Sequence, residues 1–222
     1  MKKLIFLFIV LAIIISSCGK KEEVTKEKTS PQQSGQSSGQ TQKDDSLKAA
    51  KDQMDKEKKI KLALEEEKIT KDPLGQWGID ADASSSYLDH TGKDTWSASQ
   101  MTGLPDVEAY GDNGKAWTSK EQSQGIEWVK ITYDKPVNAT EIRIRQTYNP
   151  GTIIKVELID TKGKSHIVWE GLDKTKYETD MIQYFIAKFE KTDYKTKIVK
   201  LTLATNAIGG WKEIDAVQLV GE

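Results

Sequence analysis

Short runs of β-branched and aromatic residues alternate with turn-forming residues through the carboxy-terminal two thirds of the chain. The clearest run is residues 141–146, in which Ile142 and Ile144 face one side and Arg143 and Arg145 face the other. This period of two is typical of a strand with one buried face. Further strands are expected at 127–133, 153–159, 165–169, 184–189, 198–203 and 214–220. Because turn formers rather than helices separate these runs, the pattern predicts an all-β antiparallel sandwich.

The segment before these strands has a different pattern. Residues 44–72 are rich in Ala, Leu, Lys and Glu, which favour a helix, and Pro73 and Gly75 end it. Its apolar side chains keep only a loose helical period, and they are Leu47, Met54, Ile60, Leu64 and Ile69. We therefore expect a solvated helical spacer, with a coiled-coil seam as the alternative. All tryptophans and tyrosines follow residue 76, so residues 76–222 form the predicted globular domain.

The amino terminus predicts export. Two lysines precede an apolar run over residues 4–15, which is shorter than the ~20 residues needed to span a bilayer but suits a secretory signal. The run ends in two serines and the single cysteine, Cys18. This junction resembles the lipobox of bacterial lipoproteins. The resemblance implies a signal peptide over residues 1–17 and a lipid-modified Cys18.

Acyl chains such as palmitate on Cys18 would anchor the exported protein to a bacterial membrane. Gly19 follows the cysteine in place of an acidic residue, which by the same resemblance favours the outer membrane. The alternative is a cleavage that removes Cys18 or leaves it as a free thiol.

Residues 18–43 contain no Phe, Trp or Tyr, and residues 30–40 are polar and of low complexity. Such a segment cannot bury a core, so we expect a disordered tether. Residues 35–39 match the G-x-S-x-G pattern of serine hydrolases, but that motif works only between a buried strand and a helix. We therefore do not assign a catalytic role to Ser37.

Charge and residue types exclude several classes of protein. The chain has 33 basic and 34 acidic residues and a net charge of −1, which gives no electrostatic reason to expect nucleic-acid binding. One cysteine excludes a disulfide framework and a Cys-rich metal site. His90 and His166 lack the spacing of helical metal ligands. Because no nucleophile has a nearby base and no glycine loop could bind phosphate, we expect a protein that is not an enzyme.

Five segments of the predicted domain resemble the galactose-binding domain-like superfamily. They are WSASQ at 96–100, YGDNGKAW at 110–117, EWVKITY at 127–133, EIRIR at 141–145 and EIDAVQL at 213–219. This jelly-roll group contains discoidin or coagulation-factor type C domains and many bacterial carbohydrate-binding modules. The resemblance implies a jelly-roll sandwich and a module that binds glycans in the cell envelope. A structural or protein-binding (adhesin-like) module built on the same fold is the alternative.

Loops at one end of a rigid sandwich are the usual place for recognition. Tyr148 and Asn149 lie in such a connection, Arg145 precedes it, and Trp211 follows two glycines. Together with Gln100, these residues form the predicted ligand site, because an aromatic ring can stack on a sugar while polar groups bind its hydroxyls. The competing interpretation makes Tyr148 a packing residue. The patterns around Trp117, Trp128 and Trp169 favour positions in the core.

Sandwiches of this superfamily often hold one structural calcium ion. By resemblance, Asp112 and Glu213 match two acidic positions of that site. Tyr110 and Lys115 stand where Asp and Thr are common, and a lysine supplies no oxygen to a cation. A calcium site at Asp112 and Glu213 is therefore a prediction that the resemblance makes and that Lys115 weakens.

Overall fold

The structure is a computed structural model that describes residues 38–88 and 94–222. The described chain falls into two units, one ending at Ala50 and one spanning Lys51–Glu222. The predicted signal peptide, Cys18, most of the tether and His90 lie outside the described residues. Within the described ranges, no helix is both long enough and apolar enough to cross a membrane.

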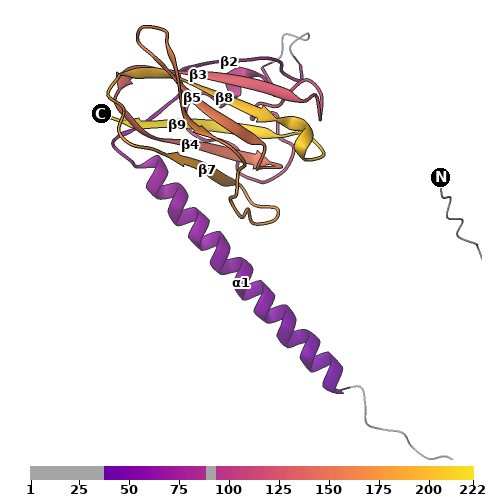
Figure 1. The fold of residues 1–222 in the computed structure, drawn as a ribbon. Helices are drawn as coiled ribbons and strands as arrows, with labels where there is room; N and C mark the ends of the chain where they lie inside the picture. Colours follow the sequence, from indigo (N-terminus) through magenta and orange to yellow (C-terminus); the bar gives the residue numbers. More distant parts are fainter. Residues whose placement is uncertain (1–37, 89–93) are drawn as a thin grey trace, which may run out of the picture. The chain divides into compact units, whose positions relative to one another are not determined.

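Two antiparallel sheets form a sandwich, which confirms the predicted fold class (Figure 1). One sheet has the order β1-β9-β4-β7, with strands Gly75–Trp77, Glu213–Gly221, Ala139–Tyr148 and Gln183–Lys188. The other has the order β2-β3-β8-β5-β6, with strands Asp80–Ala83, Ile126–Val137, Thr196–Ala204, Ile153–Asp160 and Ser165–Glu170. Two short 3₁₀ helices, η1 (Ala98–Met101) and η2 (Thr205–Ala207), lie in the connections.

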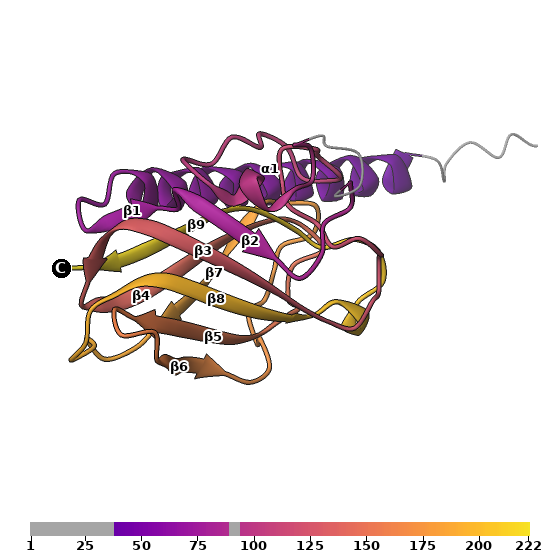
Figure 2. The same cartoon turned by 90° about the horizontal axis from the view of Figure 1, so that it is seen from above.

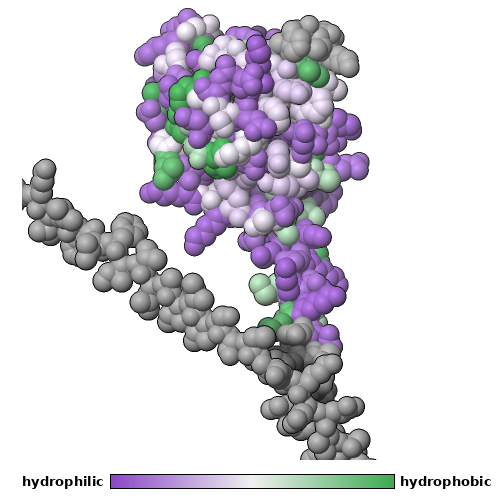
Figure 3. Space-filling model, turned by 90° about the vertical axis from the view of Figure 1, so that its right-hand side faces the viewer, coloured by the Kyte–Doolittle hydropathy of each residue, from purple (hydrophilic) through white to green (hydrophobic). Residues whose placement is uncertain are grey.

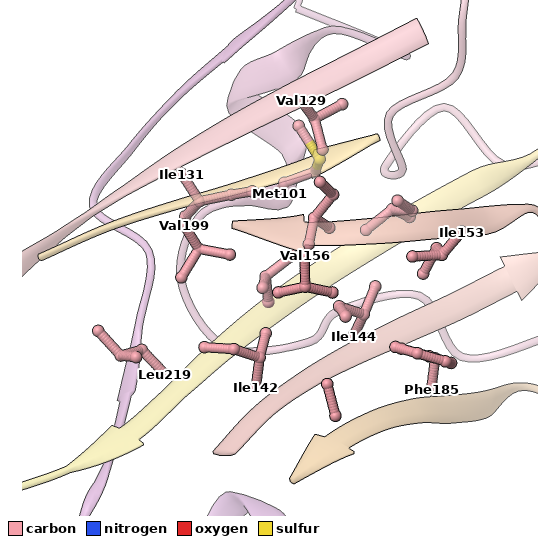
Figure 4. Packing of buried hydrophobic residues seen from close by; sticks show 14 of the residues in the cluster. Met101, Val129, Ile131, Ile142, Ile144, Ile153, Val156, Phe185, Val199 and Leu219 are labelled. Atoms are coloured by element: carbon pink, nitrogen blue, oxygen red, sulfur yellow. The ribbon is translucent and has the colours of Figure 1, made fainter. Parts of the chain in front are cut away.

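The core fills the space between the sheets with alternate residues of each strand (Figure 4). In β4, Ile142 and Ile144 point inward as the alternation predicts, and β3 contributes Val129 and Ile131 from the facing sheet. Trp117 is fully buried, which confirms its predicted position in the core. Burial of such side chains is the main favourable contribution to folding of the sandwich.

The predicted core position of Trp128 is wrong. Val129 and Ile131 face inward, so the period of β3 turns Trp128 to the outer face, where its side chain is only half-buried. The ammonium groups of Lys130 and Lys200 lie 5.7 and 5.4 Å from its ring centroid. Cation–π contacts therefore cover this indole in place of core packing.

Trp169 packs against the core, in agreement with the pattern around it. Its ring makes an edge-to-face contact with Phe185 at 4.8 Å between centroids. Because Trp169 lies in β6 and Phe185 in β7, this contact joins the two sheets at their edges.

The helix α1 spans Ser38–Thr70 and begins six residues before the expected start at residue 44. Its last turns are not solvated, which corrects the expected spacer: Ile69 is 4% exposed, and Gln218 Nε2 of β9 donates to the Ile69 carbonyl at 2.9 Å. Figure 2 shows β9 beside α1 and β6 at the opposite edge of the domain. Polar contacts hold the helix further back as well, since the Lys58 ammonium lies 2.7 Å from Glu178 and Glu66 accepts from the Tyr184 hydroxyl at 3.0 Å.

This packing predicts unequal effects of two substitutions on one helix. Ile69→Ala should lower the free energy of unfolding by about 2 kcal/mol, because it leaves a cavity against the sheet. Leu64→Ala is the control, since Leu64 is 59% exposed and its loss should cost less than ~0.5 kcal/mol. Urea denaturation of both variants measures the difference. Equal effects would mean that the end of α1 does not pack on the sandwich.

Candidate functional site

One end of the sandwich brings together loops that are far apart in the sequence. β4 ends and β9 begins at this end, because Tyr148 is paired with Glu213. Trp117 forms an isolated bridge with Ile214, which joins the loop before β3 to the same place. The Tyr87 amide donates to the Thr118 carbonyl at 3.2 Å and so brings in a further loop.

A cavity of about 100 Å³ opens among these loops, lined by Tyr87, Trp96, Asp112, Thr118 and Trp211. We call it the aromatic cavity. Tyr87 makes edge-to-face contacts with Trp96 (5.6 Å between centroids, 78° between planes) and with Trp211 (5.2 Å, 76°). Tyr87 is 37% exposed, so the cavity reaches the surface. Trp96 Nε1 donates to a carboxylate oxygen of Asp112 at 2.9 Å.

The backbone around the cavity is held in a rarely populated conformation. Trp96 has φ of 57° and Asn149 has φ of 43°, both in the left-handed region. For a bulky residue such as tryptophan this conformation costs about 1–3 kcal/mol, and such strain is concentrated at functional sites. The Trp96 amide donates to the Gly114 carbonyl at 2.9 Å, which helps to hold the residue in place.

Two buried polar atoms at the cavity have no hydrogen-bond partner among the described residues: Thr118 Oγ1 and Trp211 Nε1. The Thr118 residue is only 2% exposed. A buried polar group without a partner costs about 1–3 kcal/mol. A ligand that accepts from the indole and bonds to the hydroxyl would recover this energy.

Lys212 fixes the loop that carries Trp211. Its ammonium is buried and donates to the carbonyls of Gln122 at 3.1 Å, Gly210 at 2.5 Å and Ile208. Burial lowers the pKa of Lys212. The ammonium therefore joins residues 208–212 to the loop before β3, and this restricts where the indole of Trp211 can lie.

The structure brings three of the predicted ligand-binding residues together. Asn149 Nδ2 donates to the Trp211 carbonyl at 2.8 Å. Tyr148 packs edge to face on Tyr110 at 5.6 Å, and the Tyr110 hydroxyl accepts from the Asn149 amide at 3.3 Å. A Cβ on Gly210, whose φ is 79°, would lie 2.8 Å from Asn149 Nδ2. The loop therefore requires glycine next to Trp211.

Arg145 is not the surface donor that the strand alternation suggested. It is 8% exposed, and Nη1 donates to Asp215 at 2.5 Å and to the Val107 carbonyl at 2.9 Å. Its Nε donates to Glu66 of α1 at 3.1 Å. The helix covers this face of β4, which the strand pattern alone does not indicate. Arg145 is therefore a buried ion-pair partner.

Gln100 and Arg143 also have partners within the domain. Gln100 lies in η1, where its Nε2 donates to the Asp94 carbonyl at 2.9 Å, and it does not line the aromatic cavity. Arg143 bonds to Glu141 at 2.6 Å and to Asp72 at 2.8 Å. Arg143 and Arg145, which share the polar face of β4, thus hold the chain before β1 through Asp72 and Glu66.

Asp112 and Glu213 lie close together. Glu213 is 1% exposed and accepts from the Asn113 amide at 3.1 and 3.3 Å. Burial, and then the neighbouring Asp112, raise the pKa of Glu213 to about 9. The Lys115 ammonium lies 3.5 Å from Asp106.

Within the described ranges, no cluster of three or more His, Cys, Asp or Glu could hold a metal ion. Calcium binds about six to eight oxygens, and two carboxylates supply only part of that set. Calcium stays a prediction, and nothing proposed below depends on it.

The raised pKa of Glu213 predicts a pH dependence of stability. The folded protein keeps a proton on Glu213 that the unfolded chain releases above its ordinary pKa of 4.5. This stabilisation is therefore fully present below about pH 4.5 and is lost as the pH rises toward 9, by about 1.4 kcal/mol per pH unit. Urea denaturation between pH 6.5 and 8.5 measures the slope. Glu213→Gln should remove this contribution, and an unchanged slope would contradict it.

The sequence pattern missed Tyr87 and Thr118 altogether and assigned Trp96 only to the fold. Tyr87 stands in a polar stretch where an aromatic side chain need not be buried, and this signal could have been used. Nothing in the sequence marks Thr118. It became a candidate only because its buried Oγ1 has no hydrogen-bond partner among the described residues.

Comparison with known proteins gave matches of three kinds. The family model described as Pappalysin-1, SD scarf domain, C-terminal matches residues 41–222. F-box/LRR-repeat protein 4 of Bos taurus is 23% identical over 106 residues, which cover 44% of this chain and 17% of that protein.

Two solved structures are similar to the chain. The first chitosan-binding module of a chitosanase/glucanase from Paenibacillus sp. IK-5 has a TM-score of 0.47 at 12% identity and covers 64% of this chain and 94% of its own. The family 32 carbohydrate-binding module of NanJ from C. perfringens, in complex with galactose, has a TM-score of 0.45 at 17% identity and covers 65% and 98%.

Proposed function

The chain belongs to the family described as Pappalysin-1, SD scarf domain, C-terminal, and we propose that it uses this domain as a non-catalytic module that binds glycans. The aromatic cavity is the ligand site in this proposal. The chain spans 17% of the length of its curated relative, so the proposal concerns this domain alone.

One observation carries the proposal: three aromatic residues and Thr118 line one cavity, and two of these residues, Thr118 and Trp211, each carry a buried polar atom without a partner among the described residues. A sugar has an apolar face that fits against an aromatic ring, and its hydroxyls both donate and accept hydrogen bonds. One hydroxyl could accept from Trp211 Nε1 while another bonds to Thr118 Oγ1. The ligand would then supply the partners that the protein lacks.

The size of the cavity limits what enters it. At about 100 Å³, it is smaller than the ~300–1,000 Å³ of pockets that enclose a whole drug-sized ligand. We infer that part of one sugar enters the cavity while the rest of the glycan lies over Asn149, Tyr148 and Tyr110. Asn149 links these residues to Trp211. Its side-chain Nδ2 donates to the Trp211 carbonyl, and its main-chain N–H donates to the Tyr110 hydroxyl.

The tether places the module at a membrane in our proposal. An apolar run of residues 4–15 leads to Cys18, and acyl chains on that cysteine would hold an exported protein to a bacterial membrane. Intact-mass analysis of the mature protein tests this. A chain that begins at Cys18 with added acyl mass supports the anchor, and a mature chain without lipid mass contradicts it.

A glycan array with the purified protein in detergent tests the binding function. We expect retention of at least one class of glycan, and loss of that signal in Trp96→Ala, which removes one wall of the cavity. Trp128→Ala is the control, because Trp128 lies on the outer face of β3.

Figure 3 shows one face of the domain, which is mostly hydrophilic with hydrophobic residues in limited areas. If the wild type binds no glycan, the protein-binding alternative replaces this proposal.

A further inference from the structure

The residues that line the aromatic cavity favour one class of glycan over others. We propose that the cavity receives a protonated amine, so that the preferred glycan carries free amino groups, as an unacetylated amino sugar does. This inference rests on the proposed glycan-binding function and adds the chemical group that is recognised.

The first argument is the arrangement of the rings. Tyr87 meets both Trp96 and Trp211 with ring planes at 78° and 76°, so aromatic groups bound the cavity from more than one direction. The face of an aromatic ring carries partial negative charge and attracts cations, and tryptophan does so most strongly. Several rings around one small space are the arrangement that proteins use to bind ammonium groups.

The second argument is the charge of the lining. Asp112 is the one charged residue among the five that line the cavity, and its carboxylate is fixed there by Trp96 Nε1 at 2.9 Å. Among the described residues, no lysine or arginine lines the cavity. A carboxylate next to aromatic rings attracts a cation and repels an anionic sugar.

Lys115 and Lys212 do not neutralise Asp112. The Lys115 ammonium lies 3.3 Å from the Asp106 carbonyl and 3.5 Å from its carboxylate. The Lys212 ammonium is directed to main-chain carbonyls, including that of Gly210 at 2.5 Å. Both ammonium groups are therefore engaged elsewhere, and neither neutralises the charge of the Asp112 carboxylate.

The third argument is the pairing of donors and acceptors. A protonated amine has three N–H donors and no acceptor, so it needs oxygen atoms such as the Asp112 carboxylate and the unpartnered Thr118 Oγ1. Trp211 Nε1 is a donor and needs an acceptor, which a neighbouring hydroxyl of the same sugar supplies. An amine and a hydroxyl on one sugar ring match this set, whereas an N-acetyl group removes the charge and adds bulk.

The test is calorimetric titration of the full chain in detergent with three matched oligosaccharides of equal length. They are glucosamine oligomers, the corresponding N-acetylglucosamine oligomers and glucose oligomers. We expect the glucosamine oligomers to bind about tenfold or more tightly than the other two, in the range of a cation–π contact combined with a partly buried ion pair. Equal or weaker binding of the glucosamine oligomers would overturn the inference while leaving the glycan-binding function in place. If the protein binds none of the three oligosaccharides and also binds nothing on the glycan array, both the inference and the glycan-binding function are overturned.

Two further measurements separate recognition at the cavity from general attraction of a cationic sugar. Asp112→Asn should weaken binding of glucosamine oligomers about tenfold more than it weakens binding of neutral oligomers. Asp82→Asn, which removes an exposed carboxylate of a residue that does not line the cavity, should change neither, and equal losses in both variants would overturn the inference. In the wild type, raising the pH until the sugar amine loses its proton should weaken the glucosamine complex alone. An affinity that does not change with pH would also overturn the inference, whether or not the Asp112 variant folds.

Discussion

Arg145→Met is expected to lower the free energy of unfolding by about 3–5 kcal/mol, the range for removing one partner of a buried ion pair. The substitution leaves Asp215 buried without its 2.5 Å partner and removes the donor to Glu66 of α1. Burial already raises the pKa of Asp215 to about 6, although Arg145 opposes this effect. Without the guanidinium, the carboxylate must take up a proton or stay charged in an apolar place. Urea denaturation at pH 7.5 measures the loss.

Lys130→Met is the matched control for this prediction. Lys130 forms an ion pair with Asp82 at 3.0 Å on the surface, where the two side chains are 37% and 58% exposed. Exposed ion pairs contribute about 0–1 kcal/mol, so this variant should be nearly as stable as the wild type. Similar small losses in both variants would show that Arg145 is not the buried partner that joins α1 to β9.

Trp211→Ala is expected to weaken glycan binding by about 2–4 kcal/mol, the range for a residue that dominates an interface. The variant loses one aromatic wall and the unpartnered Nε1 donor. It keeps the main-chain carbonyl that accepts from Asn149, so the loop retains this anchor. Titration with a glycan that the wild type binds measures the affinity, and thermal melts measure the accompanying change in stability.

Trp128→Ala makes the same chemical change at a residue that does not line the cavity. Its indole lies on the outer face of β3 near Lys130 and Lys200, and its loss should leave the affinity unchanged. If both variants weaken binding to the same extent, the effect is general destabilisation. If Trp211→Ala binds as tightly as the wild type, the aromatic cavity is not the ligand site.

The sequence pattern predicted the sandwich because each long strand carries its own alternation. The strand at 141–146 shows why: Ile142 and Ile144 are buried whichever strands pair with β4. The same period explains Trp128, whose large apolar side chain suggested the core although its position in β3 faces outward. β1 and β2 were not predicted, because three and four residues are too short to show a period.

The candidate site was predicted only in part. Asn149 and Trp211 were identified because a polar loop and a pair of glycines marked them in the sequence. Arg145 was assigned to the surface because its burial depends on Glu66, 79 residues earlier in the chain. Tyr87 meets Trp96 and Trp211 only through the folded loops, and no local pattern encodes such long-range contacts.

The central claim is that a glycan bonds to the indole of Trp211 in the aromatic cavity. The most direct measurement is a titration of the ¹⁵N-labelled protein followed through the indole N–H resonances of its six tryptophans. We predict that saturation with a bound glycan shifts the Trp211 resonance most, because its Nε1 gains a hydrogen-bond partner, and that Trp96 also shifts while Trp128 stays in place. An unshifted Trp211 resonance at saturation, or a larger shift at Trp128, would contradict the account.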